Sequence, residues 1–223
     1  MKPRSSLILL VFCLIVLTQQ TRSKDVAEVI QTPLGNIKSN LFRITSNVQI
    51  QETLNIPFAQ PPINSLRFAS PRKPTPWSPT VLDGTSFGPG CPQASATIPT
   101  SEDCLQLNIW RPHQQHQADT TDDLDLVLLP VLFWVFGGGL TSGSGIQYNG
   151  TQLAALGNIV VVTVNYRVGA LGFYASQEIA AEKGNHGSNG AMNGVLDVVE
   201  ALHFVQNYIS YFGGDPTKVT IAG

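Results

Sequence analysis

The chain has 223 residues, of which 43% are hydrophobic and 13% are charged, and its formal net charge is −2. This length and composition suit one medium-sized domain with a hydrophobic core, and they exclude a disordered chain. The low charge gives no basic surface, so we expect no nucleic-acid partner.

The first 23 residues have a composition of their own. Lys2 and Arg4 precede the apolar stretch Ser6–Thr18, and the polar stretch Gln19–Ser23 follows it. This order predicts a signal peptide over residues 1–23 and a secreted, extracellular protein. A signal anchor is the alternative, but the apolar stretch is short for crossing a bilayer, so we expect no stable membrane span.

Two of the three cysteines lie outside that segment, because Cys13 falls within it. Cys91 and Cys104 form an even pair in a chain sent to an oxidising compartment, which predicts a disulfide between them. Two free thiols are the alternative.

The histidines are dispersed and show no metal-ligand spacing: His113, His116, His186 and His203. His113 and His116 lie in a polar stretch that predicts a solvated loop. His203 lies in a helical pattern, where we expect a packed or solvated side chain. We expect neither a metal nor a cofactor.

The amino-terminal part predicts short antiparallel strands. Apolar residues alternate over Val26–Thr32 and over Asn36–Ile50, and Pro33–Gly35 predicts a turn between them. These strands are expected to form a small accessory sheet.

Prolines recur over Pro57–Pro92, which predicts an extended, loop-dominated surface segment. Leu105–Trp110 then alternates as a strand, and Arg111 and Pro112 are expected to end it.

The remainder of the chain alternates apolar strands with helical patterns. Leu126–Phe136 and Asn158–Asn165 are almost continuously apolar, which is typical of buried parallel strands. The other expected elements are a helical turn at Thr151–Leu156, a loop at Gly184–Asn193, a helix over Gly194–Phe212, a stop at Gly213–Pro216 and a strand over Lys218–Ala222. The long helix is indicated by apolar residues at helical spacing, namely Val195, Val199, Leu202, Val205 and Ile209. This order predicts one α/β domain with a mostly parallel central sheet.

Three glycines, Gly137–Gly139, stop the first of these apolar strands. Main-chain N–H groups of glycines can approach a ligand closely because no Cβ intervenes, and such groups can stabilise a developing negative charge. A glycine-rich turn without chemistry is the alternative.

Several stretches, in order along the chain, resemble the type-B carboxylesterase and cholinesterase family of α/β-hydrolases. They are IPFAQPP (56–62), LRF (66–68), SEDCLQLNIW (101–110), FGGGLTSGSG (136–145), NYRVGALGF (165–173) and FGGDPTKVTIAG (212–223). The resemblance covers nearly all of Val26–Gly223 and implies a partial domain over residues 24–223, the amino-terminal part of an α/β-hydrolase fold.

The resemblance implies hydrolysis of small-molecule carboxylic esters by a serine that forms an acyl-enzyme, assisted by a histidine and an acidic residue. By position, Gly138 and Gly139 would be oxyanion-hole donors, and Gly137 would shape the turn. Cys91–Cys104 matches the family's first disulfide, and Arg167 resembles a buried structural residue rather than a catalytic one.

Gly223 matches the first glycine of the family's G-x-S-x-G nucleophile motif, so the serine, the acid and the histidine lie outside the printed chain. Ser142, Ser144 and Ser188 occupy no strand-to-helix elbow. We therefore expect the 223-residue chain alone to be inactive. The alternatives are a catalytically inactive secreted relative used for adhesion, as in neuroligin-like proteins, and a non-functional truncated product.

The chain also departs from the family pattern. Phe136 stands where family members carry histidine or tyrosine, Gln106 replaces an aromatic residue, and Asn55 replaces a glycine. No aromatic residue lies between the two cysteines, where cholinesterases carry a tryptophan for choline, so choline esters are disfavoured. Asn149-Gly150-Thr151 is a sequon that predicts glycosylation at Asn149, although a bare sequon can stay unmodified.

Overall fold

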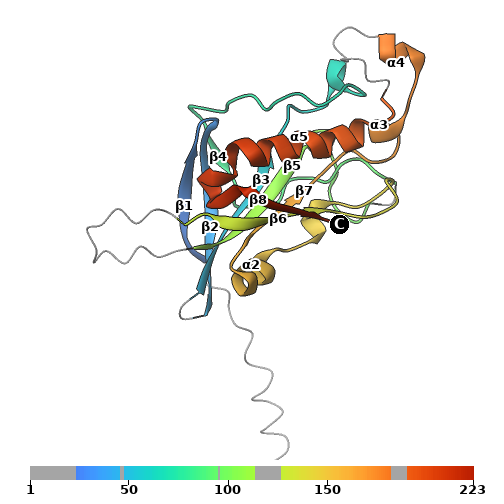
Figure 1. The fold of residues 1–223 in the computed structure, drawn as a ribbon. Helices are drawn as coiled ribbons and strands as arrows, with labels where there is room; N and C mark the ends of the chain where they lie inside the picture. Colours follow the sequence, from blue (N-terminus) through green and yellow to red (C-terminus); the bar gives the residue numbers. More distant parts are fainter. Residues whose placement is uncertain (1–23, 46–47, 95, 114–126, 182–189) are drawn as a thin grey trace, which may run out of the picture.

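The computed structural model describes residues 24–45, 48–94, 96–113, 127–181 and 190–223. Within these residues, eight strands form one sheet in the order β1-β2-β3-β5-β7-β6-β8, and β4 pairs with β2 (Figure 1). The strands are β1 (Lys24–Thr32), β2 (Gly35–Thr45), β3 (Val48–Pro57), β4 (Val81–Asp83), β5 (Gln106–His113), β6 (Leu129–Val135), β7 (Val160–Val164) and β8 (Gly214–Ala222). The expected signal peptide, residues 1–23, lies outside the described residues.

The pairings among β1, β2, β3 and β5 are antiparallel, as predicted, whereas β4 pairs with β2 in parallel. These strands do not form a separate sheet. β3 pairs with β5, for example at Thr53 and Ile109, and so joins the amino-terminal strands to the central ones. The stretch expected as one strand over Asn36–Ile50 is two strands, β2 and β3, and β3 continues to Pro57. β3 is buried along most of its length, because it has a neighbouring strand on both sides.

The other half of the sheet is parallel and lies around β6. Val131 of β6 is paired with Val160 of β7 and with Val219 of β8, so β6 is an interior strand, but it lies next to the edge strand β8 and not at the centre of the sheet as predicted. Successive side chains of β6 point to opposite faces. Val131 and Phe133 join the large core, while Leu132 and Trp134 point to the other face.

β5 runs past its expected end and includes Pro112 and His113. β7 pairs with β5 only as far as Trp110, so Pro112 has no neighbour on that side and its missing N–H costs no ladder bond there. His113 is therefore the last residue of a strand and not part of a solvated loop, and His116 lies outside the described residues.

Helices cover both faces of the sheet (Figure 1). α5 (Asn193–Tyr208) and η3 (Ile209–Phe212) cover one face, and α2 (Thr151–Gly157) packs on the other. The shorter helices are η1 (Asn64–Leu66), η2 (Gly145–Gln147), α3 (Gly169–Phe173) and α4 (Gln177–Ala181). None of the helices in the described part of the chain is long and apolar enough to cross a membrane.

α5 forms where its apolar spacing predicts, but its buried face differs at the amino-terminal end. Val195 and Val199 are 39% and 40% exposed, whereas Val205 and Ile209 are buried. The helix instead buries Gly194, which has no room for a Cβ against the Arg167 carbonyl and the Phe173 ring. This close approach turns the two valines outward.

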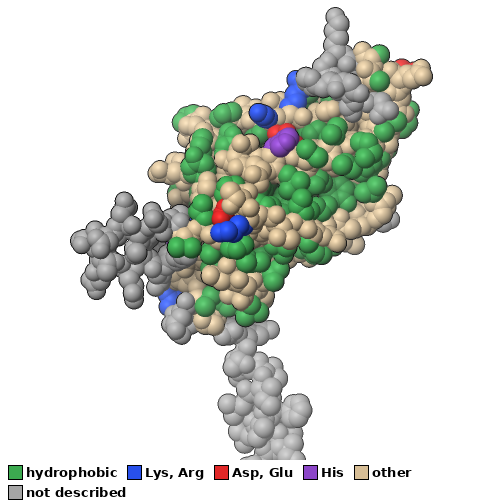
Figure 2. Space-filling view, in the orientation of Figure 1, with side chains coloured by type: hydrophobic (Ala, Val, Ile, Leu, Met, Phe, Trp, Pro, Cys, Tyr) green, Lys and Arg blue, Asp and Glu red, His purple; other side chains and the backbone are tan. Residues whose placement is uncertain are grey.

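Hydrophobic side chains consequently gather over α5 and β8 on the face that Figure 2 shows. The exposed large hydrophobic residues of α5, η3 and β8 are Val195, Val199, Tyr211 and Ile221. β8 begins at Gly214, four residues before its expected start at Lys218. It is the strand at one edge of the sheet.

Candidate active site

The glycine loop follows β6 at the carboxyl end of the parallel strands. Phe136 is buried, and its ring stacks on Tyr166 with 4.3 Å between the centroids. The Tyr166 hydroxyl donates a 2.9 Å hydrogen bond to the Phe136 carbonyl. Gly137–Leu140 are exposed, so a solvent-facing turn directly follows the buried Phe136.

Gly138 occupies a position that no other residue fits. Its φ is +149°, and a Cβ there would lie 2.0 Å from the Ser142 carbonyl oxygen. The Gly138 carbonyl accepts hydrogen bonds from the N–H groups of Thr141 and Ser142, at 3.1 and 3.3 Å. Because a trans peptide is planar, these bonds direct the Gly139 N–H of the same peptide the opposite way.

The expected oxyanion donors, Gly138 and Gly139, are both exposed. Neither N–H donates a hydrogen bond to any group in the described part of the chain. A Cβ built on Gly137 or on Gly139 would meet nothing within 4 Å, but Gly139 has a φ of +62° and Gly137 has no positive φ. The loop thus presents two unused main-chain donors at one end of the sheet.

The end of β8 lies beside this loop. Ala222 of β8 is paired with Trp134 of β6, one residue before Val135. A Cβ built on Gly223 would lie 2.5 Å from the Val135 carbonyl oxygen, so only glycine fits this approach. The residue expected to open the nucleophile motif therefore lies next to the start of the glycine loop.

Two of the serines near the loop have structural contacts. The Ser144 hydroxyl is buried and donates to the Asn165 side-chain oxygen at 2.9 Å, and the Ser142 hydroxyl donates to the Gly138 carbonyl at 3.4 Å. Asn165 in turn donates to the Pro89 carbonyl at 3.0 Å. Ser188 lies outside the described residues.

The segment around the cysteines forms one wall of a pocket beside the glycine loop. Cys91 and Cys104 form the predicted disulfide. The pocket has a volume of about 350 Å³, and its lining includes Gln93, Ile98, Gly137, Ser142 and Gly143. Gln93 contacts Gly143 directly, a contact that the sequence did not predict.

Arg167 has the structural position expected of it. Its side chain is 2% exposed and forms two parallel hydrogen bonds to Asp197 of α5, from Nε at 2.8 Å and from the terminal nitrogen at 2.7 Å. It also donates to the Ala69 carbonyl at 2.8 Å. Burial raises the pKa of the Asp197 carboxyl, and the hydrogen bonds from Arg167 oppose this shift.

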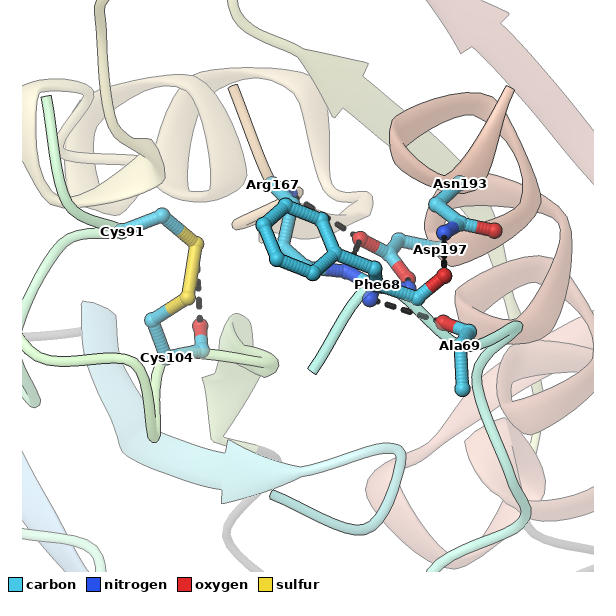
Figure 3. Close-up of polar contacts among 7 residues, drawn as sticks. All are labelled: Phe68, Ala69, Cys91, Cys104, Arg167, Asn193 and Asp197. Atoms are coloured by element: carbon cyan, nitrogen blue, oxygen red, sulfur yellow. Dashed lines mark hydrogen bonds and ion pairs between the residues drawn. A yellow bond between two sulfur atoms is a disulfide. The ribbon is translucent and has the colours of Figure 1, made fainter. Parts of the chain in front are cut away.

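Figure 3 shows Asp197 and Asn193 reaching from α5 toward the loop that carries Phe68 and Ala69. Asn193 donates a 2.5 Å hydrogen bond to the Phe68 carbonyl. Asp197 was missed in the sequence because a charged residue on an apolar helix is ordinarily assigned to its solvent face. The available signal was Arg167 itself, since a buried guanidinium needs a carboxylate partner.

The described histidines take no part in this site. The His203 side chain is 60% exposed, and its ring nitrogen lies 3.4 Å from Glu200 on the same helix. His113 lies 3.5 Å from Glu28 in the amino-terminal part of the sheet. Among the described residues, no three His, Cys, Asp or Glu side chains come together as a metal site would require.

The replacement of a family glycine by Asn55 has a physical explanation. Asn55 has a φ of +57°, a left-handed conformation that asparagine tolerates better than most residues other than glycine. Asn149 is exposed, and its side-chain oxygen accepts a 2.9 Å hydrogen bond from the Thr151 N–H at the start of α2.

Comparison with protein families gives a match over almost the whole described chain. A model of the carboxylesterase family matches residues 26–223. The chain is 41% identical over 207 residues to a cocaine esterase of Oryctolagus cuniculus, covering 86% of this chain and 36% of that protein. It is 43% identical over 182 residues to a fumonisin B1 esterase of Sphingopyxis macrogoltabida, covering 78% of this chain and 31% of that protein.

Solved structures agree with these matches. A carboxylesterase of Geobacillus stearothermophilus superposes with a TM-score of 0.71 at 35% identity, covering 86% of this chain and 36% of that one. A thermophilic pNB esterase gives a TM-score of 0.70 at 34% identity, covering 88% of this chain and 38% of that one. The fold is therefore that of α/β-hydrolase esterases, and the chain spans between 31% and 38% of the length of these four relatives.

Proposed function

Because the chain belongs to the carboxylesterase family, we propose that the protein hydrolyses small-molecule carboxylic esters through an acyl-enzyme, with the glycine loop after β6 as its oxyanion-binding part. The observation that carries this proposal is the pair of unused N–H groups of Gly138 and Gly139, which lie beside the end of β8.

In this mechanism a serine attacks the ester carbonyl, and the carbonyl oxygen acquires negative charge as the tetrahedral intermediate forms. N–H groups that are already oriented before the reaction stabilise that charge without reorganising. The fixed peptides that carry the Gly138 and Gly139 N–H groups would therefore lower the barrier to forming the intermediate. The serine would follow Gly223 in the G-x-S-x-G motif, where the parallel pairing of β8 with β6 brings the chain toward the loop.

We propose in addition that the 223-residue chain by itself does not hydrolyse esters. It spans about a third of the length of its relatives, and no serine of the described part occupies a strand-to-helix elbow. A longer product of the same gene would supply the serine, the histidine and the acid.

The test begins by sequencing the transcript through its stop codon, and then expresses both the 223-residue chain and any longer product. The longer product is expected to hydrolyse p-nitrophenyl acetate, and the shorter chain is not. In the longer product, Gly138→Ala is expected to lower kcat by about 10²–10³-fold, because it disturbs the oxyanion donors. Gln152→Ala, on the exposed side of α2, serves as the matched control.

Two results would overturn the proposal. The first is a longer transcript that encodes glycine or alanine in place of the serine, which would favour the adhesion alternative. The second is full esterase activity of the Gly138→Ala variant. Choline esters are expected to be poor substrates of the longer product, because the segment between Cys91 and Cys104 carries no aromatic residue.

We also propose that the protein is secreted and that Asn149 carries an N-linked glycan. The support is the signal-peptide pattern of residues 1–23, the sequon and the exposed position of Asn149. Expression in a secretory eukaryotic cell should give a glycosidase-sensitive mass that Asn149→Gln abolishes. A single glycosidase-insensitive band would contradict glycosylation.

A further inference from the structure

Gln93 makes an unusual set of contacts for a side chain in an irregular segment. Its amide nitrogen donates to the Gly143 carbonyl at 2.9 Å, and its amide oxygen accepts from the Gly143 N–H at 2.8 Å. The same nitrogen donates to the Cys91 carbonyl at 3.1 Å. One carboxamide therefore pairs with both polar groups of a single backbone residue, and uses its remaining N–H on its own segment.

Gly143 lies directly against the first peptide of the glycine loop. A Cβ built on Gly143 would lie 2.7 Å from the Gly137 carbonyl oxygen and 2.4 Å from the Phe136 ring. The Gly137 carbonyl belongs to the same planar peptide as the Gly138 N–H, so the position of Gly143 constrains the direction of that N–H.

The neighbouring residue constrains the second donor. Ser142 precedes Gly143 and donates its N–H to the Gly138 carbonyl, which shares a peptide with the Gly139 N–H. A shift of Gly143 would therefore disturb both peptides that carry the candidate oxyanion donors. Gly143 connects Gln93 to each of them.

The segment that carries Gln93 is itself held in place. The Cys91–Cys104 disulfide closes it, and the Gly90 N–H donates to the Pro99 carbonyl at 2.9 Å. Asn165, at the end of β7, donates to the Pro89 carbonyl. Because the backbone of this segment is fixed, Gln93 can hold Gly143 in place and does not move with it.

We propose that Gln93 is a positioning residue that fixes the two oxyanion donors by clamping Gly143. The proposal rests on the ester-hydrolase function proposed above. The amide N–H groups and oxygen of Gln93 are used on main-chain groups of Cys91 and Gly143, so it acts through Gly143 and through the two peptides on which Gly143 packs.

The first experiment uses the 223-residue chain and needs no catalysis. In a sample labelled with ¹⁵N-glycine, Gln93→Met is expected to speed hydrogen exchange of the Gly143 amide by about tenfold, because the side chain keeps its length but loses its hydrogen bonds. The resonances of Gly138 and Gly139 are expected to shift with it. Gln152→Met on α2 is the control and should leave all three amides unchanged.

A second variant separates positioning from simple loss of packing. The carboxylate of Gln93→Glu can still accept from the Gly143 N–H, but it faces two carbonyl oxygens without a donor. On protonation, as the pH falls toward about 4, the carboxylic acid regains a donor for the Gly143 carbonyl. The Gly143 resonance of Gln93→Glu is therefore expected to return toward its wild-type position at low pH.

The third measurement uses the longer ester-hydrolysing product. Gln93→Met is expected to lower kcat by roughly tenfold to a hundredfold with little change in KM, because misplaced donors weaken the transition state more than substrate binding. The activity of Gln93→Glu relative to wild type in the same buffer should rise as the pH falls.

The outcomes distinguish the two proposals. Gly143 exchange that is unchanged in Gln93→Met overturns the clamp, whatever the activity of the longer product. Altered Gly143 exchange with unmoved Gly138 and Gly139 resonances, or with unchanged kcat, overturns the positioning role. A longer product without esterase activity overturns the proposed function, while the exchange and resonance measurements still decide whether Gln93 positions the two donors.

Discussion

Two arginine–carboxylate pairs in this molecule have nearly the same geometry and opposite surroundings. Arg67 and Glu102 form two hydrogen bonds of 2.6 Å each, and their side chains are 48% and 28% exposed. Arg167 and Asp197 form two of 2.8 and 2.7 Å, and their side chains are 2% and 0% exposed. Both pairs join segments that are distant in the sequence.

The difference shows that hydrogen-bond geometry does not by itself measure what a pair contributes to stability. The hydrogen bonds that Arg67 donates to Glu102, more than the charge of Glu102, raise the pKa of Arg67, but water screens this exposed pair. Arg167 also holds the Ala69 carbonyl, so its loss would leave buried polar groups on two segments. We therefore expect the buried pair and the contacts around it to contribute more to stability than the exposed pair, by holding the loop that carries Phe68 and Ala69 against α5.

The largest expected effect is that of Asp197→Ala. Removing one partner leaves the Arg167 guanidinium buried without a counter-charge, which is expected to destabilise the chain by about 3–5 kcal/mol in urea unfolding. The double variant Arg167→Met with Asp197→Leu should recover part of this loss, since no buried charge remains. Equal destabilisation by Asp197→Ala and Glu102→Ala would show that burial does not distinguish the contributions of the two pairs to stability.

Removal of the Cys91–Cys104 disulfide is expected to cause the next largest loss of stability. Replacing Cys91 and Cys104 by serine removes the loop-closure constraint on the unfolded chain, at an expected cost of about 3 kcal/mol. The measurement is urea unfolding of the double variant beside that of the wild type, with the mass of the alkylated protein confirming the disulfide. An unchanged midpoint would show that the neighbouring hydrogen bonds hold the segment without the disulfide.

Asn193→Ala tests a buried neutral contact beside the buried ion pair. It removes the hydrogen bond to the Phe68 carbonyl, with an expected loss of about 1 kcal/mol. Urea unfolding measures the loss, and Gln152→Ala provides an exposed control of similar size. A loss as large as that of Asp197→Ala would mean that charge is not what distinguishes the buried pair.

Glu102→Ala is expected to change the unfolding midpoint very little, and less still at high salt, because both side chains of the pair are partly solvated. Thermal unfolding at two salt concentrations measures this. A salt-independent loss would place the exposed pair in the same class as the buried one.

The smallest effect is expected for Asp215→Asn and only in acid. Hydrogen bonds from Thr217 and Lys218 lower the pKa of Asp215 to about 2. A carboxyl whose pKa is lower in the folded state stabilises that state above its unfolded pKa, near 4, and this contribution is lost as the pH falls toward 2. The wild-type thermal midpoint should fall more steeply than that of Asp215→Asn over this range, and parallel curves would contradict the assignment.

Patterns that depend on near neighbours in the sequence were predictable. The valine-rich run of β7, the glycine stop after β6 and the pairing of Cys91 with Cys104 all follow from local composition and agree with the structure. The extent and burial of β3 could not be predicted from local composition, because Gln51, Glu52 and Thr53 are polar and nevertheless buried.

The reason is a contact from another strand. The Trp110 indole N–H of β5 donates to a side-chain oxygen of Glu52 at 2.7 Å, so a buried polar side chain is satisfied by a partner far along the chain. Asp197 with Arg167 and Gln93 with Gly143 are of the same kind. In each case the residue types are ordinary, and only the folded chain shows which of them meet.

The register of the sheet has a consequence for the order of folding. Thr32 pairs with Gly35 across a two-residue turn, whereas Val131 pairs with Val219 only after a long intervening stretch. Contacts between residues close in sequence form sooner because closing a short loop costs less entropy. We therefore expect the β1–β2 hairpin to form early and β8 to join late, so that Gly223 reaches the glycine loop in the final steps and folding intermediates keep that loop open.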